Sequence, residues 1–216
     1  MKRKVSILLV SFLICGLFLT NCSQGQFYGW TPPVEGLQWG MSKAEVMDAL
    51  KLTNDDIDTP ADDSALHFMP KKEYELFGVM MTVRFLFQAP EDAFTGIRVL
   101  VNEGDLDVVE KAITEKLGEG QYSYSYEESF LKQTVISVRW DDVLFEGQPE
   151  LINRVKEIYD SYGNDVYDDR ARQLANSPLV YYVLNRNETS PSYGLLEIYG
   201  GYAAMLNYPE KFSKKK

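Results

Sequence analysis

The sequence has few of the residues that most often build catalytic or metal sites. Its 216 residues include two cysteines and one histidine, His67. A catalytic histidine needs a nucleophile and an orienting acid, and no Gly-x-Ser-x-Gly motif is present. Zinc requires three or four His, Cys or carboxylate ligands at suitable spacing, which this chain lacks. We therefore expect His67 to be an ordinary strand residue and predict no catalytic residue, no metal site and no cofactor.

Alanine is absent from residues 1–43, and this absence bears on how the amino-terminal end is processed. A basic stretch at residues 2–4 precedes an apolar run at residues 5–19, the pattern of an export signal. Ordinary signal cleavage requires small residues in an Ala-x-Ala-like pattern, and none is available here. The run is also shorter than the roughly 20 apolar residues of a spanning helix, which makes an uncleaved anchor the weaker alternative.

A cysteine follows the apolar run directly. The sequence Leu19-Thr20-Asn21-Cys22 resembles the lipobox of bacterial lipoproteins, in the relaxed form of spirochaetes. In that family the cysteine becomes the first residue of the mature chain and carries acyl groups such as palmitate. The resemblance implies a signal peptide at residues 1–21, lipidation at Cys22, and export to a bacterial membrane, either inner or outer. Cys15 would leave with the signal, so no free thiol would remain.

Charge and composition restrict the remaining body. The net charge is −10, and removal of the three cations at residues 2–4 takes it to −13. A charge of this sign repels phosphate backbones, so we expect no nucleic-acid partner. Hydrophobic residues make up 45% and charged residues 25%, the usual mixture of a globular protein. Attachment to the membrane is therefore expected through the lipid at Cys22 and not through the folded body.

Periodicity predicts an α+β fold with an antiparallel β-sheet and helices packed on one of its faces. A tether at residues 22–35 precedes two helix-plus-hairpin modules, residues 36–118 and 119–213, which either stand apart or form a single domain. Helices are expected at residues 42–50, 105–117, 149–163 and 165–176. Strands are expected at residues 79–88, 97–101, 122–131, 134–140, 179–184, 193–199 and 202–206.

The segment Gly36–Val46 resembles the opening of small envelope lipoproteins with the BamE-like or BLIP-like fold. They share a Gly-Met-(Ser/Thr)-x-x-(Glu/Gln)-Val helix start followed by a β-meander. In this chain Ser42 and Glu45 supply the two side chains of a capping box. Lys116-Leu117-Gly118-Glu119, before a strand ending at Trp140, is similar to a second module in relatives. The resemblance implies a non-enzymatic, periplasm-facing protein that docks on another envelope protein.

Acidic residues offer two further possibilities. Two clusters, at residues 55–63 and 160–169, have oxygen ligands suited to calcium but lack the D-x-[DN]-x-[DN]-G pattern. Solvated faces are therefore the expected interpretation, and calcium the alternative. Paired carboxylates drawn from Glu127, Glu128, Asp141 and Asp142 would suit a hydrolase acting on cell-wall or glycan material.

Tyrosine is abundant, with 14 residues in the chain. Tyr122, Tyr124 and Tyr126 alternate with serines, so one side of an extended segment would carry all three rings. Other tyrosines gather near the carboxyl end, at positions 181, 182, 193, 199, 202 and 208. Tyrosine is favoured at recognition surfaces, although a sheet face buried beneath its own helices would explain the same pattern. We predict a binding or scaffolding module for an envelope protein or polymer, with Tyr122, Tyr124, Tyr126 and the loop 55–63 as candidate contacts.

Overall fold

The computed structural model describes residues 30–58, 66–88, 92–127, 133–144, 148–161, 177–187 and 193–212. The lipobox with Cys22 and the predicted helix at residues 165–176 lie outside these ranges. No helix within them is long and apolar enough to span a membrane.

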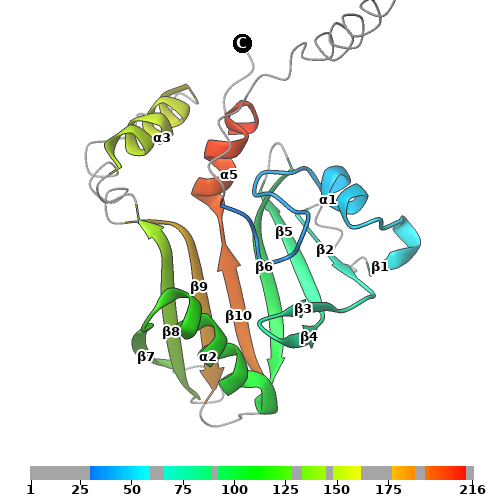
Figure 1. The fold of residues 1–216 in the computed structure, drawn as a ribbon, viewed down its shortest axis with the longest axis vertical. Coiled ribbons are helices and arrows are strands. Elements are labelled where there is room, and N and C mark those ends of the chain that lie inside the picture. Colours follow the sequence, from blue (N-terminus) through cyan, green and yellow to red (C-terminus); the bar gives the residue numbers. More distant parts are fainter. Residues whose placement is uncertain are drawn as a thin grey trace, which may run out of the picture.

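The described residues form an eight-stranded antiparallel sheet, a two-stranded hairpin and α-helices (Figure 1). The strands are β1 (Ile57–Asp58), β2 (His67–Pro70), β3 (Tyr74–Leu76), β4 (Val79–Met81), β5 (Val83–Gln88), β6 (Ala93–Asn102), β7 (Gln121–Glu127), β8 (Gln133–Leu144), β9 (Pro178–Asn187) and β10 (Tyr193–Tyr199). The helices are α1 (Lys43–Ala49), α2 (Leu106–Leu117), α3 (Pro149–Ser161) and α5 (Gly201–Asn207). The predicted α+β class is confirmed.

The large sheet has the strand order β1-β2-β5-β6-β10-β9-β8-β7. Every neighbouring pair is antiparallel. The last strand of the sequence, β10, lies between β6 and β9 and pairs with both. Strands from the first and second halves of the chain therefore meet in the middle of one sheet.

One face of the sheet is covered by α1, α2 and the β3–β4 hairpin (Figure 1). Alternation in the strands explains this cover: Leu196 and Ile198 of β10 are fully buried on this side. The inward face of α2 supplies Val109 and Ile113, also fully buried. The indole N–H of Trp140 in β8 donates to Thr114 Oγ1 at 3.2 Å and joins α2 to the sheet. The predicted packing of helices on one face is confirmed.

Short-range signals set two of the helix ends, and the capping box is one that the sequence predicts. Ser42 and Glu45 form the capping box at the start of α1, with Glu45 Oε2 accepting from the Ser42 N–H at 2.7 Å. Gly118 ends α2 with φ +88°, a conformation that glycine adopts without strain. Both helix boundaries are therefore set by short-range chemistry.

The predicted strand at residues 79–88 is wrong as a single element. It is two strands separated at Thr82: β4 pairs with β3, and β5 pairs with β2 and β6. Phe77 and Gly78, both at positive φ, make the two-residue turn of the β3–β4 hairpin. The hairpin then leaves the sheet plane and packs over β6, because buried Leu76 and Met81 need cover.

The predicted strand at residues 202–206 is also wrong, because these residues belong to helix α5. Four consecutive residues of this helix, from Ala203 to Leu206, are buried, which no half-covered strand would allow. Helices α5 and α3 pack on each other beyond the ends of the strands (Figure 1). They close that end of the core, with Leu151 and Val155 of α3 among the buried residues.

Candidate functional site

The second face of the large sheet carries half-exposed side chains in the described part of the chain. We call it the open face. Its positions alternate with the buried ones, and the register aligns them across the strands. The residues that define it are Arg84, Leu86, Arg98, Leu100, Leu195, Glu197, Tyr199, Tyr181, Val183, Asn185, Ser137, Arg139 and Asp141.

Glu197 organises the centre of the open face. Its Oε1 accepts from Arg98 Nη2 at 2.6 Å and from the Tyr199 hydroxyl at 2.8 Å. Burial lowers the pKa of Arg98, but its contacts with Glu197 and Tyr199 outweigh this and raise the pKa above the ordinary value. Burial, together with the hydrogen bond to Glu197, raises the pKa of Tyr199. Arg98 therefore stays cationic and Tyr199 stays a neutral donor at physiological pH.

A second cluster lies beside the first, on β8 and β9. Arg139 Nε donates to Asp141 at 2.7 Å, and its guanidinium lies 4.6 Å from the ring centre of Tyr181. The ring of Tyr181 also packs against that of Tyr199, with centres 5.1 Å apart. Burial raises the pKa of Tyr181, against the opposing effect of Arg139. Neighbours on both sides thus hold these two tyrosine rings in fixed positions.

Arg84 has a different environment. It lies directly opposite Arg98 in the β5–β6 register, which places two cations side by side. Among the described residues Arg84 has no hydrogen-bond or ion-pair partner of its own, whereas Arg98 is paired with Glu197. The defined open face therefore holds three arginines and two carboxylates, although the whole chain has a net charge of −10.

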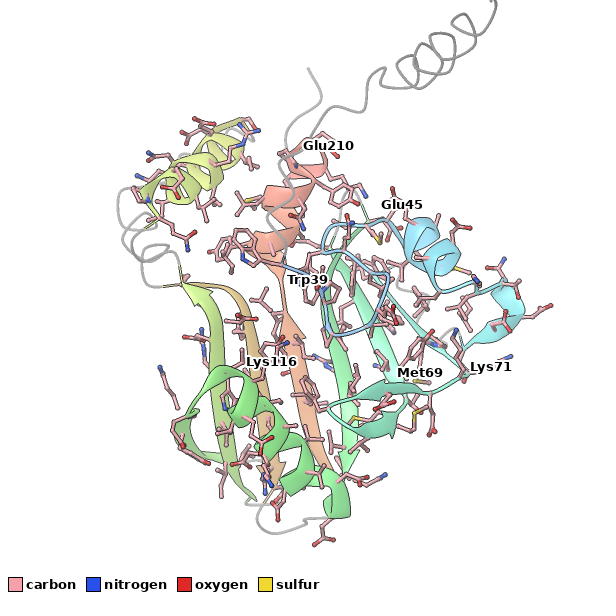
Figure 2. All side chains as sticks on the ribbon, in the orientation of Figure 1. Trp39, Glu45, Met69, Lys71, Lys116 and Glu210 are labelled. Atoms are coloured by element: carbon pink, nitrogen blue, oxygen red, sulfur yellow. The ribbon has the colours of Figure 1, made fainter. Side chains whose placement is uncertain are left out.

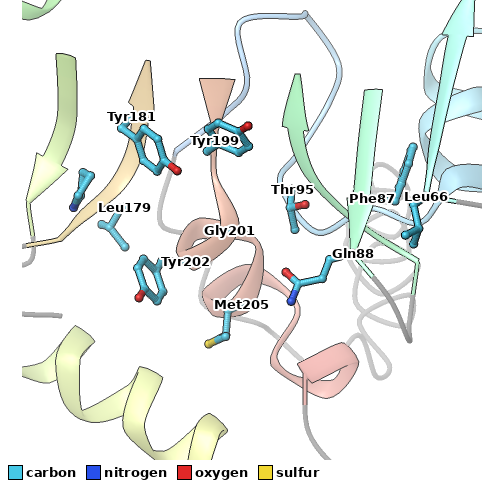
Figure 3. Close-up of a pocket in the computed structure, with 11 residues that line it drawn as sticks. Leu66, Phe87, Gln88, Thr95, Leu179, Tyr181, Tyr199, Gly201, Tyr202 and Met205 are labelled. Carbon is cyan, nitrogen blue, oxygen red and sulfur yellow. The ribbon is translucent and has the colours of Figure 1, made fainter. Parts of the chain in front are cut away.

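A cavity of about 590 Å³ lies where the open face meets α5 (Figure 3). Three phenol rings line it, those of Tyr181, Tyr199 and Tyr202, together with Gln88 and Thr95. The remaining lining is Leu66, Phe87, Pro178, Leu179, Gly201 and Met205. No carboxylate, histidine or cysteine is among these residues. The lining suits recognition of an uncharged, partly apolar group.

The cavity depends on an irregularity in β6. The β5–β6 register shifts between Leu86 and Phe87, which leaves Thr95 as an extra residue in β6. Phe94 before it is fully buried on the covered face, while Thr95 lines the cavity. This bulge turns a polar side chain into the cavity without exposing the core.

A second cavity, of about 320 Å³, lies between the β3–β4 hairpin and the end of β6. Glu73 and Asp105 are two of its lining residues, together with Met80 and Asn102. Neither of these two carboxylates is among the candidates predicted from the sequence. Asp141 and Asp142, which are among those candidates, are consecutive in β8 and lie on opposite faces: Asp141 pairs with Arg139 and Asp142 lies near Lys116. They cannot act on one bond together.

The predicted contact residues have mixed outcomes. Tyr122 is 55% exposed, and its hydroxyl donates to Glu110 of α2 at 2.6 Å. The backbone of Tyr124 and Tyr126 is part of β7, and their side chains lie outside the description. The loop 55–63 is described only to Asp58, and Cys22 is not described. His67 is in strand β2, as predicted.

Arg98, Arg139 and Glu197 are site residues that were not predicted from the sequence. Alternation within each strand could have placed each residue on a face. The contact between Arg98 and Glu197, however, spans 99 positions and depends on β10 pairing with β6. The pairing of β10 with β6 cannot be predicted from a short stretch of sequence.

Comparisons with known proteins give no relative. No family model, no curated protein and no solved structure matches the chain.

Proposed function

We propose that this chain is a lipid-anchored cell-envelope protein that binds another envelope protein or polymer without chemically changing it. The observation that carries the proposal is the cavity on the open face, lined by tyrosines and apolar residues and by no carboxylate, histidine or cysteine. A binding site needs shape, apolar contact and a few oriented hydrogen-bonding groups, all of which this lining offers.

The open face supports the same function. Tyr181 and Tyr199 are fixed by each other, by Arg139 and by Glu197, so little side-chain entropy would be lost when a partner contacts them. Tyrosine and arginine are also the residues most enriched at the energetic centres of interfaces. The preferred partner therefore offers apolar groups to the cavity and polar groups to its rim.

The proposed location rests on the amino-terminal sequence. A basic stretch, an apolar run and Leu19-Thr20-Asn21-Cys22 together favour export and acylation at Cys22. Diacylation gives stable attachment, whereas a single acyl chain holds a protein only marginally. The tether at residues 22–35 spans at most about 50 Å when fully extended, so a partner would lie close to the membrane.

Photo-crosslinking in intact cells tests the binding function. A photoreactive phenylalanine analogue replaces Tyr202 in the cavity in one variant and Lys111 in another. Lys111 lies on α2, over the covered face, and its side chain is 77% exposed. We expect a discrete adduct from position 202 and none of the same mass from position 111. Equal labelling from both positions, or none from position 202, would contradict the proposal.

The alternative is an envelope hydrolase, and the smaller cavity is what favours it. Glu73 and Asp105 line that cavity and would be the acid and base. The two functions separate by experiment, because Glu73→Gln and Asp105→Asn would each abolish hydrolysis of cell-wall glycan. We expect the unmodified protein to release no glycan fragments, and release that both variants abolish would establish the hydrolase instead.

A further inference from the structure

Strand β7 forms one edge of the large sheet, and its outer side has no partner strand among the described residues. All seven of its residues pair in regular register with β8, from Gln121 to Glu127. An edge strand presents a row of unpaired backbone N–H and C=O groups that can receive another strand. The opposite edge ends in β1, which is only two residues long.

The sequence of β7 lacks the usual protection of an edge strand. Natural edges are blocked by lysine, proline, bulges or very short strands. Residues 121–127 contain no lysine, proline or glycine, and the β7–β8 register has no bulge. Glu127, at the very end, is the strand's only charged residue. In a chain with net charge −10, the first six residues of this edge, 121–126, carry no charge.

The strand is also nearly palindromic. It reads Gln-Tyr-Ser-Tyr-Ser-Tyr-Glu, so its two directions differ only at the end residues, Gln121 and Glu127. An antiparallel pair of two such strands about a two-fold axis at Tyr124 places tyrosine opposite tyrosine and serine opposite serine. Glu127 then faces Gln121 of the other copy, so no like charges meet. Moving the axis by one residue loses two of the seven pairs.

We propose that β7 is a self-association edge at which two copies of this chain pair antiparallel, with Tyr124 on the two-fold axis. The isologous pair joins two eight-stranded sheets into one continuous sheet. Aromatic cross-strand pairs and backbone hydrogen bonds contribute the stability. A second copy of β7 fits this edge well, because self-pairing places tyrosine opposite tyrosine and serine opposite serine along the strand. The proposal is independent of the proposed function.

Disulfide crosslinking of the full chain in membranes tests the register. Opposed Cα atoms in antiparallel strands lie about 4.5–5.5 Å apart, within the range that a disulfide bridges. Tyr124→Cys should therefore give a dimer on oxidation with diamide. Tyr122→Cys should not, since the two copies of position 122 would lie about 13 Å apart. Tyr122→Cys combined with Tyr126→Cys should restore the dimer.

The unmodified chain gives the background from Cys15 and Cys22. A dimer from Tyr124→Cys that is absent from Tyr122→Cys supports the proposal. Absence of any dimer above background, equal dimers from the two single variants, or an adduct with a different protein overturns it.

A charge-swap experiment gives a matched control that does not depend on thiols. Sedimentation of the full chain in mild detergent should report a dimer. Ser123→Lys with Ser125→Lys places cations opposite one another across the axis and should weaken the dimer at least tenfold. Ser123→Lys with Ser125→Glu places each cation opposite an anion and should retain it. A monomeric native chain, or equal behaviour of the two variants, contradicts self-pairing at this edge.

Discussion

The indole ring of Trp39 lies against Gly200, the residue that joins β10 to α5. A Cβ placed on Gly200 would overlap the indole and would come within 2.8 Å of its Cε3 atom. Trp39, labelled in Figure 2, is fully buried. Its ring stacks on that of Phe94, with ring centres 4.9 Å apart. Its carbonyl accepts from Asn207 Nδ2 at 3.2 Å. The entry segment of the chain is thereby fixed to the last helix.

Gly200→Ala is expected to destabilise the protein by about 1–3 kcal/mol, the usual cost of overpacking a filled core. Gly200 has a negative φ of −127°, so the effect would be steric and not conformational. Gly201→Ala is the matched control, because a Cβ there meets nothing within 4 Å. It should leave stability unchanged or raise it by about 0.5–1 kcal/mol. Urea unfolding measures both, and equal effects would argue against the packing described.

Glu45 should make stability depend on pH in the acid range. Burial raises its pKa, but hydrogen bonds from Ser42 and the nearby Lys211 outweigh this, so the pKa lies below its ordinary value of 4.5. A lowered pKa contributes stability above about pH 4.5 that is lost as the pH falls through the folded-state value. Glu45→Gln should therefore lower the unfolding midpoint at pH 7 and have a progressively smaller effect toward pH 3.

Signals between near neighbours were the most predictive part of the sequence. The capping box of Ser42 and Glu45 and the helix stop at Gly118 act over three or four residues. Such signals depend on chemistry that is complete within one helical turn, so folding of the rest of the chain does not alter them. The class of fold followed from the same short-range periodicities.

Long-range contacts explain what the sequence did not reveal. Residues 202–206 read as a strand, yet they form a helix, because burial against α3 and the strand ends outweighs weak local preference. The site itself depends on such contacts: Tyr181 and Tyr199 meet only because β9 and β10 pair. The position of β10 between β6 and β9 depends on the arrangement of the whole sheet. A short segment of sequence does not contain that information.

Tyr74→Phe is expected to stabilise the protein by about 1 kcal/mol at pH 7. The Tyr74 hydroxyl is buried and has no hydrogen-bond partner among the described residues, and such a group costs roughly 1–3 kcal/mol. Burial raises the pKa of Tyr74 to about 12, from 10. Between about pH 10 and 12 the unfolded chain loses this proton while the folded protein keeps it, so the stability of the native protein falls over that range.

The same variant should therefore show a larger advantage at pH 11 than at pH 7. Tyr122→Phe is the control at pH 7, where it removes a hydroxyl that donates to Glu110 and should not stabilise the protein. A loss of stability in Tyr74→Phe would mean that the hydroxyl has a partner in the folded protein.

Cys22→Ser is expected to abolish acylation. If the lipobox-like sequence is processed as proposed, the thiol at position 22 carries the lipid. Metabolic labelling with a palmitate analogue should mark the native chain and not the variant, which should move from the membrane fraction to the soluble fraction. Cys15→Ser is the control and should keep both properties. Labelling retained in Cys22→Ser would exclude the lipid anchor at this residue.

Glu197→Gln is expected to cost about 1 kcal/mol at low salt, because it removes the anion that balances two opposed arginines. Arg84 and Arg98 occupy directly paired positions, and only Arg98 contacts the Glu197 carboxylate. The cost should fall in an Arg84→Gln background, where the repulsion is absent, and also at about 1 M salt, where the screening length is near 3 Å. Glu157→Gln, which breaks an exposed pair with Arg154, should change stability by less than about 0.5 kcal/mol in either background. A double-mutant cycle measures the coupling, and strictly additive effects of Glu197→Gln and Arg84→Gln would show that the two arginines do not repel across the sheet.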